Sequence, residues 1–294
     1  MFFLRKRLAA AFMGSGLAIA AMAPVAHAQS AAPATSAGYP RKAGEFAAAI
    51  VVDAKTGEEV YGFAADAKWS AASLTKLMSA LVFLQYRPAW STPVAMKRAD
   101  EVGGARLRLN VGSRITVKDA FYSSLVGSAN NATVAMARST GYSTPGFVRR
   151  MNAKAKAMGM TRTAFVDPSG IDPNNISTAR DLASLVSGAM AYRDIRGAMQ
   201  SSSYAFTVIA PKMSKNIVNT NKLLGHLDGF SMVGGKTGYL EESQYNFAMQ
   251  VRSKKTGNTY VVVVLGSPTK QGAFDSAEKL AAWAETAPKM VAKR

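Results

Sequence analysis

The chain has 294 residues, and its 36 Lys and Arg against 18 Asp and Glu give a formal net charge of +18. It contains no cysteine and only two histidines, which excludes disulfides and thiolate metal sites and argues against a histidine-based zinc site. The positive charge favours anionic partners through long-range attraction but does not by itself identify one.

Residues 1–28 have the pattern of a secretory signal peptide. A basic start, Arg5-Lys-Arg7, precedes a mostly apolar stretch from about Leu8 to Ala21, and Ala26-His-Ala28 forms a small-residue cleavage site. We therefore predict export to the periplasm of a Gram-negative-type cell, or to another extracytoplasmic, wall-associated location. The alternative is an uncleaved N-terminal anchor. No later segment offers roughly 18 uncharged apolar residues, so we expect at most a peripheral membrane contact.

Removal of the predicted signal peptide would change the net charge, and export would change the partners that the positive charge can meet. The signal carries three basic residues and no acidic ones, so the remainder has 33 Lys and Arg against 18 Asp and Glu, a net charge of +15. An exported chain rarely meets nucleic acid, which we do not expect as a partner. Anionic cell-wall polymer or a membrane surface suits the compartment better, although the charge is equally compatible with solubility alone.

The remaining chain predicts one domain. Residues 29–42 are rich in Ala, Ser, Pro and Gly and predict a flexible linker, followed by a domain over 43–294. Strands are predicted at 46–52 and 59–63, joined by a turn at 53–57, and at 245–251 and 259–265, joined by a turn at 254–258. Helices are predicted at 72–85, 118–137, 145–158, 178–191 and 272–287. Strands at both ends with helices between them predict an α+β fold whose termini share one antiparallel sheet.

A serine and a lysine at the start of the first helix are the candidates for chemistry. Ser73-Leu-Thr-Lys76 places a hydroxyl and an amine three residues apart, on one face of a strongly apolar helix. The amine can take the hydroxyl proton if burial or a neighbouring cation lowers the pKa of the lysine. The helix N-terminus adds positive potential where an oxyanion would develop.

Other serines and histidines compete for this role. Ser276-Ala-Glu-Lys279 has the same spacing, but it is predicted to lie among charged neighbours on an ordinary surface helix. A Ser-His-Asp triad would have to use His226, because His27 belongs to the signal, and no Gly-x-Ser-x-Gly elbow is present to receive it. We therefore favour lysine over histidine as the base.

Two further motifs follow in order. Ser128-Ala-Asn130 lies at a predicted helix boundary, and Lys236-Thr-Gly238 follows a glycine pair and precedes an apolar strand. Together they supply a second hydroxyl for proton relay, an amide to hold a substrate backbone, a second cation and a hydroxyl for a substrate carboxylate. Similar motifs occur at Ser214-Lys-Asn216 and, in predicted hairpin turns, at Lys55-Thr-Gly57 and Lys255-Thr-Gly257.

With these motifs, the chain resembles the low-molecular-mass D-alanyl-D-alanine carboxypeptidase family of penicillin-binding proteins. The resemblance extends over about residues 43–280, with matching segments at 73–80, 151–161, 165–170, 177–183, 219–224 and 234–239. It implies a β-lactamase/transpeptidase-like α+β fold, in which an antiparallel sheet flanked by helices adjoins a helical lobe. It also implies peptidoglycan stem peptides as substrates, β-lactam antibiotics as covalent inhibitors, and no metal or cofactor.

The resemblance assigns roles as well. Ser73 would be acylated by the penultimate D-Ala carbonyl with Lys76 as general base, and Ser128 with Lys236 would pass a proton to the leaving amine. The oxyanion hole would be formed by the backbone N–H groups of Ser73 and Tyr239, and Thr237 would contact the substrate carboxylate. The residues expected to bind substrate are Asn130, Lys236, Thr237, Gly238 and Tyr239.

Two features favour the D,D-endopeptidase branch, whose members cut D-Ala–diaminopimelate cross-links, over carboxypeptidases that remove terminal D-Ala. The chain stops soon after its last predicted helix, without the family's frequent C-terminal β-domain and membrane anchor. It also contains Arg106-Leu-Arg-Leu109 and the segment 151–156. One departure concerns the site itself, because Leu240–Tyr245 stands where the family commonly continues with an Ala-Gly pair. The carboxypeptidase alternative stays open.

Two rival functions are less well supported. A class A β-lactamase needs a glutamate that activates the deacylating water, and no glutamate occurs between Glu101 and Glu241. Asp167 or Asp172 could substitute, but their segment is typical of a turn. We therefore predict slow β-lactam turnover. The other rival is a catalytically silent wall-binding scaffold, which would have no reason to keep all the site residues.

Overall fold

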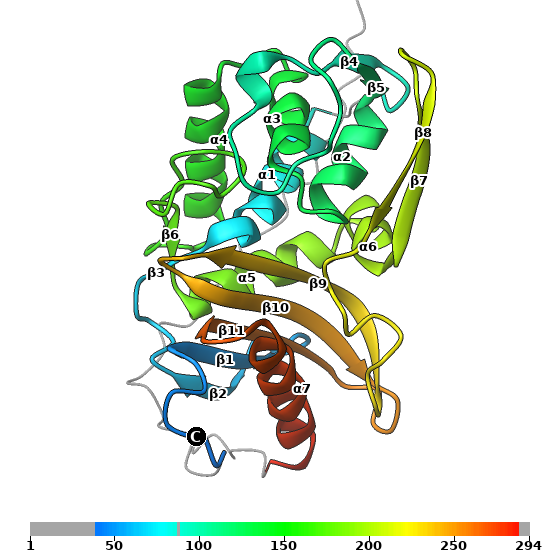
Figure 1. Ribbon diagram of the computed structural model, residues 1–294. Helices are drawn as coiled ribbons and strands as arrows, with labels where there is room; N and C mark the ends of the chain where they lie inside the picture. Colours follow the sequence, from blue (N-terminus) through cyan, green and yellow to red (C-terminus); the bar gives the residue numbers. More distant parts are fainter. Residues whose placement is uncertain (1–38, 87–88, 288–294) are drawn as a thin grey trace, which may run out of the picture. The chain divides into compact units, whose positions relative to one another are not determined.

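The computed structural model describes residues 39–86 and 89–287 and contains a five-stranded antiparallel sheet (Figure 1). Its strands are β1 (Ala48–Asp53), β2 (Glu59–Phe63), β9 (Phe230–Leu240), β10 (Gln244–Ser253) and β11 (Thr259–Ser267). The order is β2-β1-β11-β10-β9, so strands from the two ends of the chain pair at the centre. The predicted α+β fold with a shared terminal sheet is confirmed.

Between β2 and β9 the described residues form six α-helices, and a seventh follows the last strand. They are α1 (Thr75–Leu84), α2 (Val117–Leu125), α3 (Asn130–Arg138), α4 (Thr144–Ala157), α5 (Ala179–Met190) and α6 (Arg193–Gln200), with α7 (Lys270–Thr286) after the last strand. Three short strand pairs join them: β3 (Trp69–Ser70) with β6 (Ile176–Ser177), β4 (Pro93–Ala95) with β5 (Arg114–Thr116), and β7 (Ser203–Val208) with β8 (Met213–Val218).

Both faces of the sheet are covered, which explains the uninterrupted apolar runs of β1 and β11. Alternate residues point to opposite faces. Ile50 and Val263 join the core shared with the helices α1 to α6, whereas Val51 and Val262 join the core beneath α7. Strand β9 is left at the edge of the sheet, where it contacts the turn that begins the first helix.

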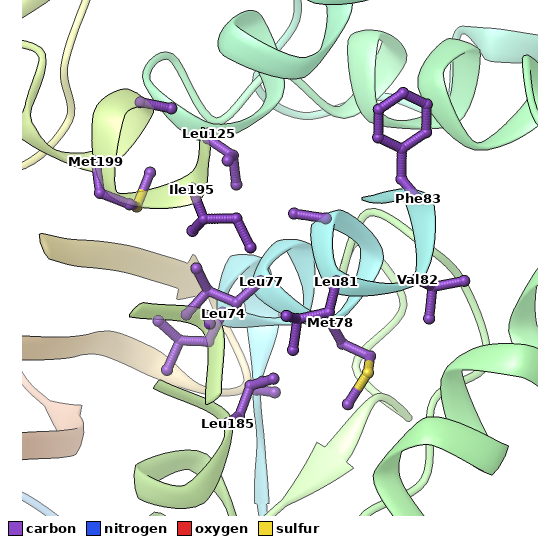
Figure 2. Packing of buried hydrophobic residues seen from close by; sticks show 14 of the residues in the cluster. Leu74, Leu77, Met78, Leu81, Val82, Phe83, Leu125, Leu185, Ile195 and Met199 are labelled. Carbon is purple, nitrogen blue, oxygen red and sulfur yellow. The ribbon is translucent and has the colours of Figure 1, made fainter. Parts of the chain in front are cut away.

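Helix α1 is buried on all sides. Every residue from Thr75 to Phe83 is buried, and the helix continues a 3₁₀ turn over Ala72–Leu74. Figure 2 shows its apolar side chains beside Leu125 of α2, Leu185 of α5 and Ile195 of α6. A helix that is apolar around its whole circumference belongs in a core. Lys76 is therefore carried into the core, where its side chain has no exposed surface.

A tight turn over residues 167–172 packs against the start of this helix. Gly170 has φ +77°, and a Cβ placed there would lie 1.9 Å from the carbonyl oxygen of Ala72. Both the left-handed backbone and the close approach require glycine at this position. The Asp167 carboxylate closes the turn by accepting hydrogen bonds from the backbone N–H groups of Ser169, Gly170 and Asp172.

The helix predicted over 118–137 is wrong in one respect, because it is divided in two. Helix α2 ends at Leu125 and α3 begins at Asn130. Between them Ser128 has φ +58°, a left-handed conformation that an α-helix cannot contain. The backbone N–H of Asn130 bonds to the carbonyl of Ala105 instead of continuing the first helix.

Three other predictions need correction. Lys236-Thr-Gly238 lies inside β9 rather than before a strand. The hairpin β7–β8 and helix α6 were not predicted. Ser276, expected on a surface helix, is buried on α7 and donates a hydrogen bond to Glu45, whereas Lys279 is exposed. The second Ser-x-x-Lys motif therefore does not bring its two side chains to one place.

The predicted signal peptide and most of the predicted linker lie outside the described residues. Tyr39, inside the predicted linker range, packs edge-on against Tyr61 and Trp283, so at least residue 39 of that range belongs to the packed domain. Within 39–86 and 89–287, none of the helices has the length and apolar character needed to cross a bilayer.

Replacing Gly170 by alanine tests the fit of the turn against the first helix. Gly159, which ends α4, is the matched control. It has φ +74° but no atom within 4 Å of the position that a Cβ would take, so Gly159→Ala carries only the backbone strain. We expect Gly170→Ala to lower the free energy of unfolding in urea by at least about 2 kcal/mol more than Gly159→Ala does. Equal losses in the two variants would show that the close approach to Ala72 does not matter.

Candidate active site

A pocket of about 680 Å³ lies where the edge strand β9 meets the starts of α1 and α3. Six of the eight residues singled out from the sequence line it, namely Ser73, Ser128, Asn130, Thr237, Gly238 and Tyr239. The other two, Lys76 and Lys236, are fully buried behind its wall. The structure therefore brings together segments that are more than a hundred residues apart in the sequence.

Ser73 and Lys76 are in direct contact. The Nζ atom of Lys76 lies 2.7 Å from Ser73 Oγ, 2.7 Å from Asn130 Oδ1 and 2.5 Å from the backbone oxygen of Ser169. Ser73 is partly exposed to the pocket, whereas Lys76 has no exposed surface. The hydroxyl thus faces the pocket while the amine sits behind it.

These three contacts match the bonding capacity of an uncharged amine. The carbonyl of Ser169 and the Oδ1 atom of Asn130 can only accept, so they take the two N–H donors of a neutral Lys76. The lone pair that remains then faces Ser73 Oγ, which can donate its proton to it. In its neutral form, Lys76 can therefore keep both of these bonds and still accept the proton of Ser73.

The electrostatics of the site favour the same protonation state. Burial lowers the pKa of Lys76 well below its ordinary value, the nearby Lys236 lowers it further, and Asp167 acts in the opposite direction. Desolvation dominates because a buried ammonium loses its hydration without a carboxylate in contact to replace it. Lys76 is therefore suited to act as a base near neutral pH.

Lys236 and Ser128 form a second amine–hydroxyl pair. Lys236 Nζ donates to Ser128 Oγ at 2.8 Å and to the backbone oxygen of Thr237 at 2.9 Å. The left-handed backbone of Ser128 occurs at the break between α2 and α3, where strain of this kind is often found at functional sites. Burial lowers the pKa of Lys236 to about 7, so this amine can carry or release a proton near neutrality.

Asn130 links the buried amine of Lys76 to the loop that borders the pocket. Its Oδ1 accepts from Lys76, and its Nδ2 donates to the backbone oxygen of Gly103 at 2.9 Å. A side-chain amide has two N–H groups, so one remains to donate to a bound molecule. Gly104 needs its lack of a side chain here, because a Cβ would lie 2.7 Å from Asn130 Nδ2.

Gly238 lets the edge strand approach the nucleophile. A Cβ at this position would lie 3.3 Å from the backbone nitrogen of Ser73 and 3.2 Å from the oxygen of Ala71. The backbone of β9 at Gly238 and Tyr239 is thereby held beside Ser73. On the same strand, Thr237 Oγ1 donates to Thr220 Oγ1 at 2.7 Å, and both threonines line the pocket.

Several contributors were missed by the sequence analysis. The carbonyl of Ser169 has no side-chain motif, although the Asp-Pro-Ser-Gly turn that presents it was noticed. Asn246 was also missed. Its side chain donates to the backbone of Ser70 and accepts from Gly266, joining β10 to the segment before the nucleophile. The sequence feature that could have identified Asn246 is its position as a single polar residue between Tyr245 and Phe247.

The atypical segment after Tyr239 forms the turn between β9 and β10. Ser243 is buried in this turn, where its Oγ accepts from the backbone N–H of Leu240 and its carbonyl accepts from the indole of Trp69. Tyr239 and Tyr245 face each other across the two strands with ring centroids 4.4 Å apart. Leu240 and Glu241 line the pocket.

The competing motifs lie elsewhere. His226, Ser214, Lys55 and Lys255 are exposed, and none of them lines the pocket. Over the residues the structure describes, no group of three or more His, Asp or Glu side chains is placed to hold a metal ion.

Comparisons with known proteins agree with this geometry. A family model described as D-alanyl-D-alanine carboxypeptidase matches residues 35–269. A D-alanyl-D-alanine endopeptidase of Pseudomonas aeruginosa is 32% identical over 266 residues, which cover 89% of this chain and 84% of that protein. A D-alanyl-D-alanine carboxypeptidase of Bacillus subtilis is 29% identical over 86% of this chain and 64% of its own length. The crystal structure of the Streptomyces K15 DD-transpeptidase is similar with a TM-score of 0.76 at 26% identity, covering 82% of this chain and 97% of that one.

The lowered pKa of Lys236 predicts a pH-dependent stability. Between pH 7 and the ordinary lysine value of 10.5, the unfolded chain holds a proton at this residue that the folded chain has released, so stability rises with pH. Lys236→Met removes this contribution. We therefore expect the unfolding free energy of the variant minus that of wild type to fall from pH 7 to about pH 9.5, at up to about 1.4 kcal/mol per pH unit.

Lys255→Met is the control for that measurement, because Lys255 belongs to another Lys-Thr-Gly sequence but is exposed in a turn. Its urea denaturation curves should keep a constant difference from wild type across the same range. A constant difference for Lys236→Met as well would mean that Lys236 remains fully charged in the fold.

Proposed function

Because the chain belongs to the D-alanyl-D-alanine carboxypeptidase family, we propose that it is an exported serine D,D-peptidase that acts on peptidoglycan stem peptides through an acyl-enzyme. The observation that carries the proposal is the contact between Ser73 Oγ and the buried amine of Lys76 at 2.7 Å. A nucleophile and its base in hydrogen-bond contact are what covalent catalysis requires.

Acylation follows from this contact. Ser73 Oγ attacks the carbonyl carbon of the penultimate D-Ala while its proton passes to the neutral amine of Lys76. The backbone N–H groups of Ser73 and Tyr239 would bind the oxyanion, a role supported by the close approach of β9 at Gly238. The C–N bond then breaks, and the leaving amine takes a proton from Ser128, which Lys236 resupplies across 2.8 Å.

Deacylation uses the same groups in reverse. After the leaving amine has departed, Lys76 gives up the proton that it took from Ser73 and Lys236 regains one, so both amines return to their starting states. Water then loses a proton to Lys76 and attacks the ester carbonyl, and Ser73 leaves with a proton returned by the lysine. The free acid and the active serine are regenerated, and no external oxidant or reductant is consumed.

Binding of the leaving residue would use its carboxylate. Thr237 lines the pocket and offers a hydroxyl to such a group. Asn130 would hold the substrate backbone through its free N–H. Gly238 and Tyr239 would pair with an extended peptide along the open edge of β9, as peptides do at exposed sheet edges.

β-Lactam antibiotics would acylate Ser73 and be released slowly. Burial would raise the pKa of Asp167, but hydrogen bonds from Ser169, Asp172 and Asn175 outweigh that effect and lower it. Its carboxylate is thus occupied in closing the turn and is a poor base for a deacylating water. This supports a penicillin-binding peptidase over a β-lactamase.

The preferred substrate is proposed to be the D-Ala–diaminopimelate cross-link. Endopeptidases from Pseudomonas aeruginosa and Escherichia coli, each 32% identical to this chain, support that choice. Removal of terminal D-Ala is the alternative, favoured by carboxypeptidase relatives at 28–30% identity.

Digestion of defined muropeptides tests the proposal. We expect wild type to convert cross-linked dimers to monomers faster than it shortens monomeric pentapeptides, as followed by mass spectrometry. Ser73→Ala should abolish both reactions and covalent labelling by fluorescent penicillin. Lys76→Arg should reduce them by a factor of about 10³ or more, because guanidinium does not give up its proton.

Ser214→Ala is the control, since Ser214 is exposed and belongs to a Ser-x-Asn sequence outside the pocket. It should digest and label like wild type. Faster loss of terminal D-Ala than of cross-links would replace the endopeptidase assignment by the carboxypeptidase one. Digestion that persists in Ser73→Ala would overturn the peptidase proposal itself.

A further inference from the structure

Two of the residues that line the pocket carry a charge. They are Lys270 at the start of α7 and Glu241 in the turn after β9. The proposed reaction leaves Glu241 without a role. The chain has a net charge of +18, so an acidic side chain that lines its pocket is unusual and indicates that the ligand carries a cationic group there.

The order of residues along β9 determines which part of the substrate meets Glu241. The leaving amine must lie beside Ser128, because the proton reaches it from the Ser128–Lys236 pair. The scissile carbonyl lies at Ser73 and Tyr239. The acyl part of the substrate therefore continues in the opposite direction along the strand, past Leu240 to Glu241.

The turn that carries Glu241 is held in place by several contacts. Its backbone oxygen accepts from the side chain of Gln244 at 2.6 Å, and Gln244 itself has a left-handed backbone with φ +53°. Ser243 is buried and bound by Leu240 and Trp69. A turn fixed in this way presents its acidic residue at a constant distance from the nucleophile.

Glu241 is also available for a ligand. None of the three salt bridges found among the described residues includes it. Lys270 also lies toward this end of the pocket, because β11 runs parallel to β9 and α7 begins just after it, but none of these salt bridges joins it to Glu241. Both glutamates of the turn are exposed, but of the two only Glu241 lines the pocket.

We propose that Glu241 forms a subsite for a side-chain ammonium group on the residue that precedes the scissile D-Ala. This inference rests on the proposed function and deepens it, because it names the chemistry recognised on the acyl side of the bond. A stem peptide whose diamino acid has a free side-chain amine would fit the subsite. A stem whose amine is acylated would lose the contact.

Two peptides that differ at one amine test the subsite. Both have the sequence Lys-D-Ala-D-Ala with an acetylated α-amine, and the lysine ε-amine is free in one and acetylated in the other. We expect kcat/KM of wild type to be about two- to fivefold higher for the free amine, the range of a partly exposed ion pair. The ratio should fall toward one in Glu241→Gln and below one in Glu241→Lys.

Glu242→Gln is the matched control and should keep the wild-type ratio. The preference should also shrink as salt is added, because the contact is partly exposed. Equal rates for the two peptides in wild type, or an unchanged ratio in Glu241→Gln, would overturn the subsite while Ser73-dependent hydrolysis still supports the peptidase. Hydrolysis of neither peptide by a wild type that also fails to cut cross-linked muropeptides would overturn the proposed function and the subsite with it.

Discussion

The cost of burying a charged amine is the constraint on which the site depends. Lys76 has no exposed surface and no carboxylate in contact, so its neutral form is favoured and a lysine becomes a base. Helix α1 enforces this by being apolar around its circumference (Figure 2). Gly170 and Asp167 then bring the Ser169 carbonyl onto the amine, which leaves its lone pair for Ser73.

The sheet and the helical part of the molecule each supply one amine–hydroxyl pair. Ser73 and Lys76 come from one helix, whereas Lys236 of β9 meets Ser128 at the break between α2 and α3. The two buried amines interact, since Lys236 lowers the pKa of Lys76. Because the two amines lie close together, they take different roles. Lys76 stays neutral and accepts a proton, whereas Lys236 titrates near pH 7 and supplies one.

Much of this could be predicted from the sequence, for reasons that differ between residues. Ser73 and Lys76 were found because helical spacing and an apolar flank together predict a buried pair, and Ser128 and Lys236 because of their order along the chain. The helix range 118–137 missed the break at Ser128, although the Ser128-Ala-Asn130 motif was placed at a helix boundary. A left-handed serine depends on tertiary contacts, here those of the following backbone with Ala105. The carbonyl of Ser169 was missed because a backbone atom leaves no mark in the sequence. The place of Lys236 inside β9 was missed because two glycines before it obscured the strand pattern.

The protonation state of Lys76 is the central claim, and it can be measured directly. Wild type with ¹³C- and ¹⁵N-labelled lysine would be titrated by NMR correlation of Cε with Nζ, with Lys76 assigned by comparison with Lys76→Met. At pH 8 a lysine with an ordinary pKa is charged. We expect the Lys76 signal to have the shifts of a neutral amine at that pH. A Lys76 signal with the shifts of an ammonium group at pH 8 would contradict the account, because no lone pair would then face Ser73.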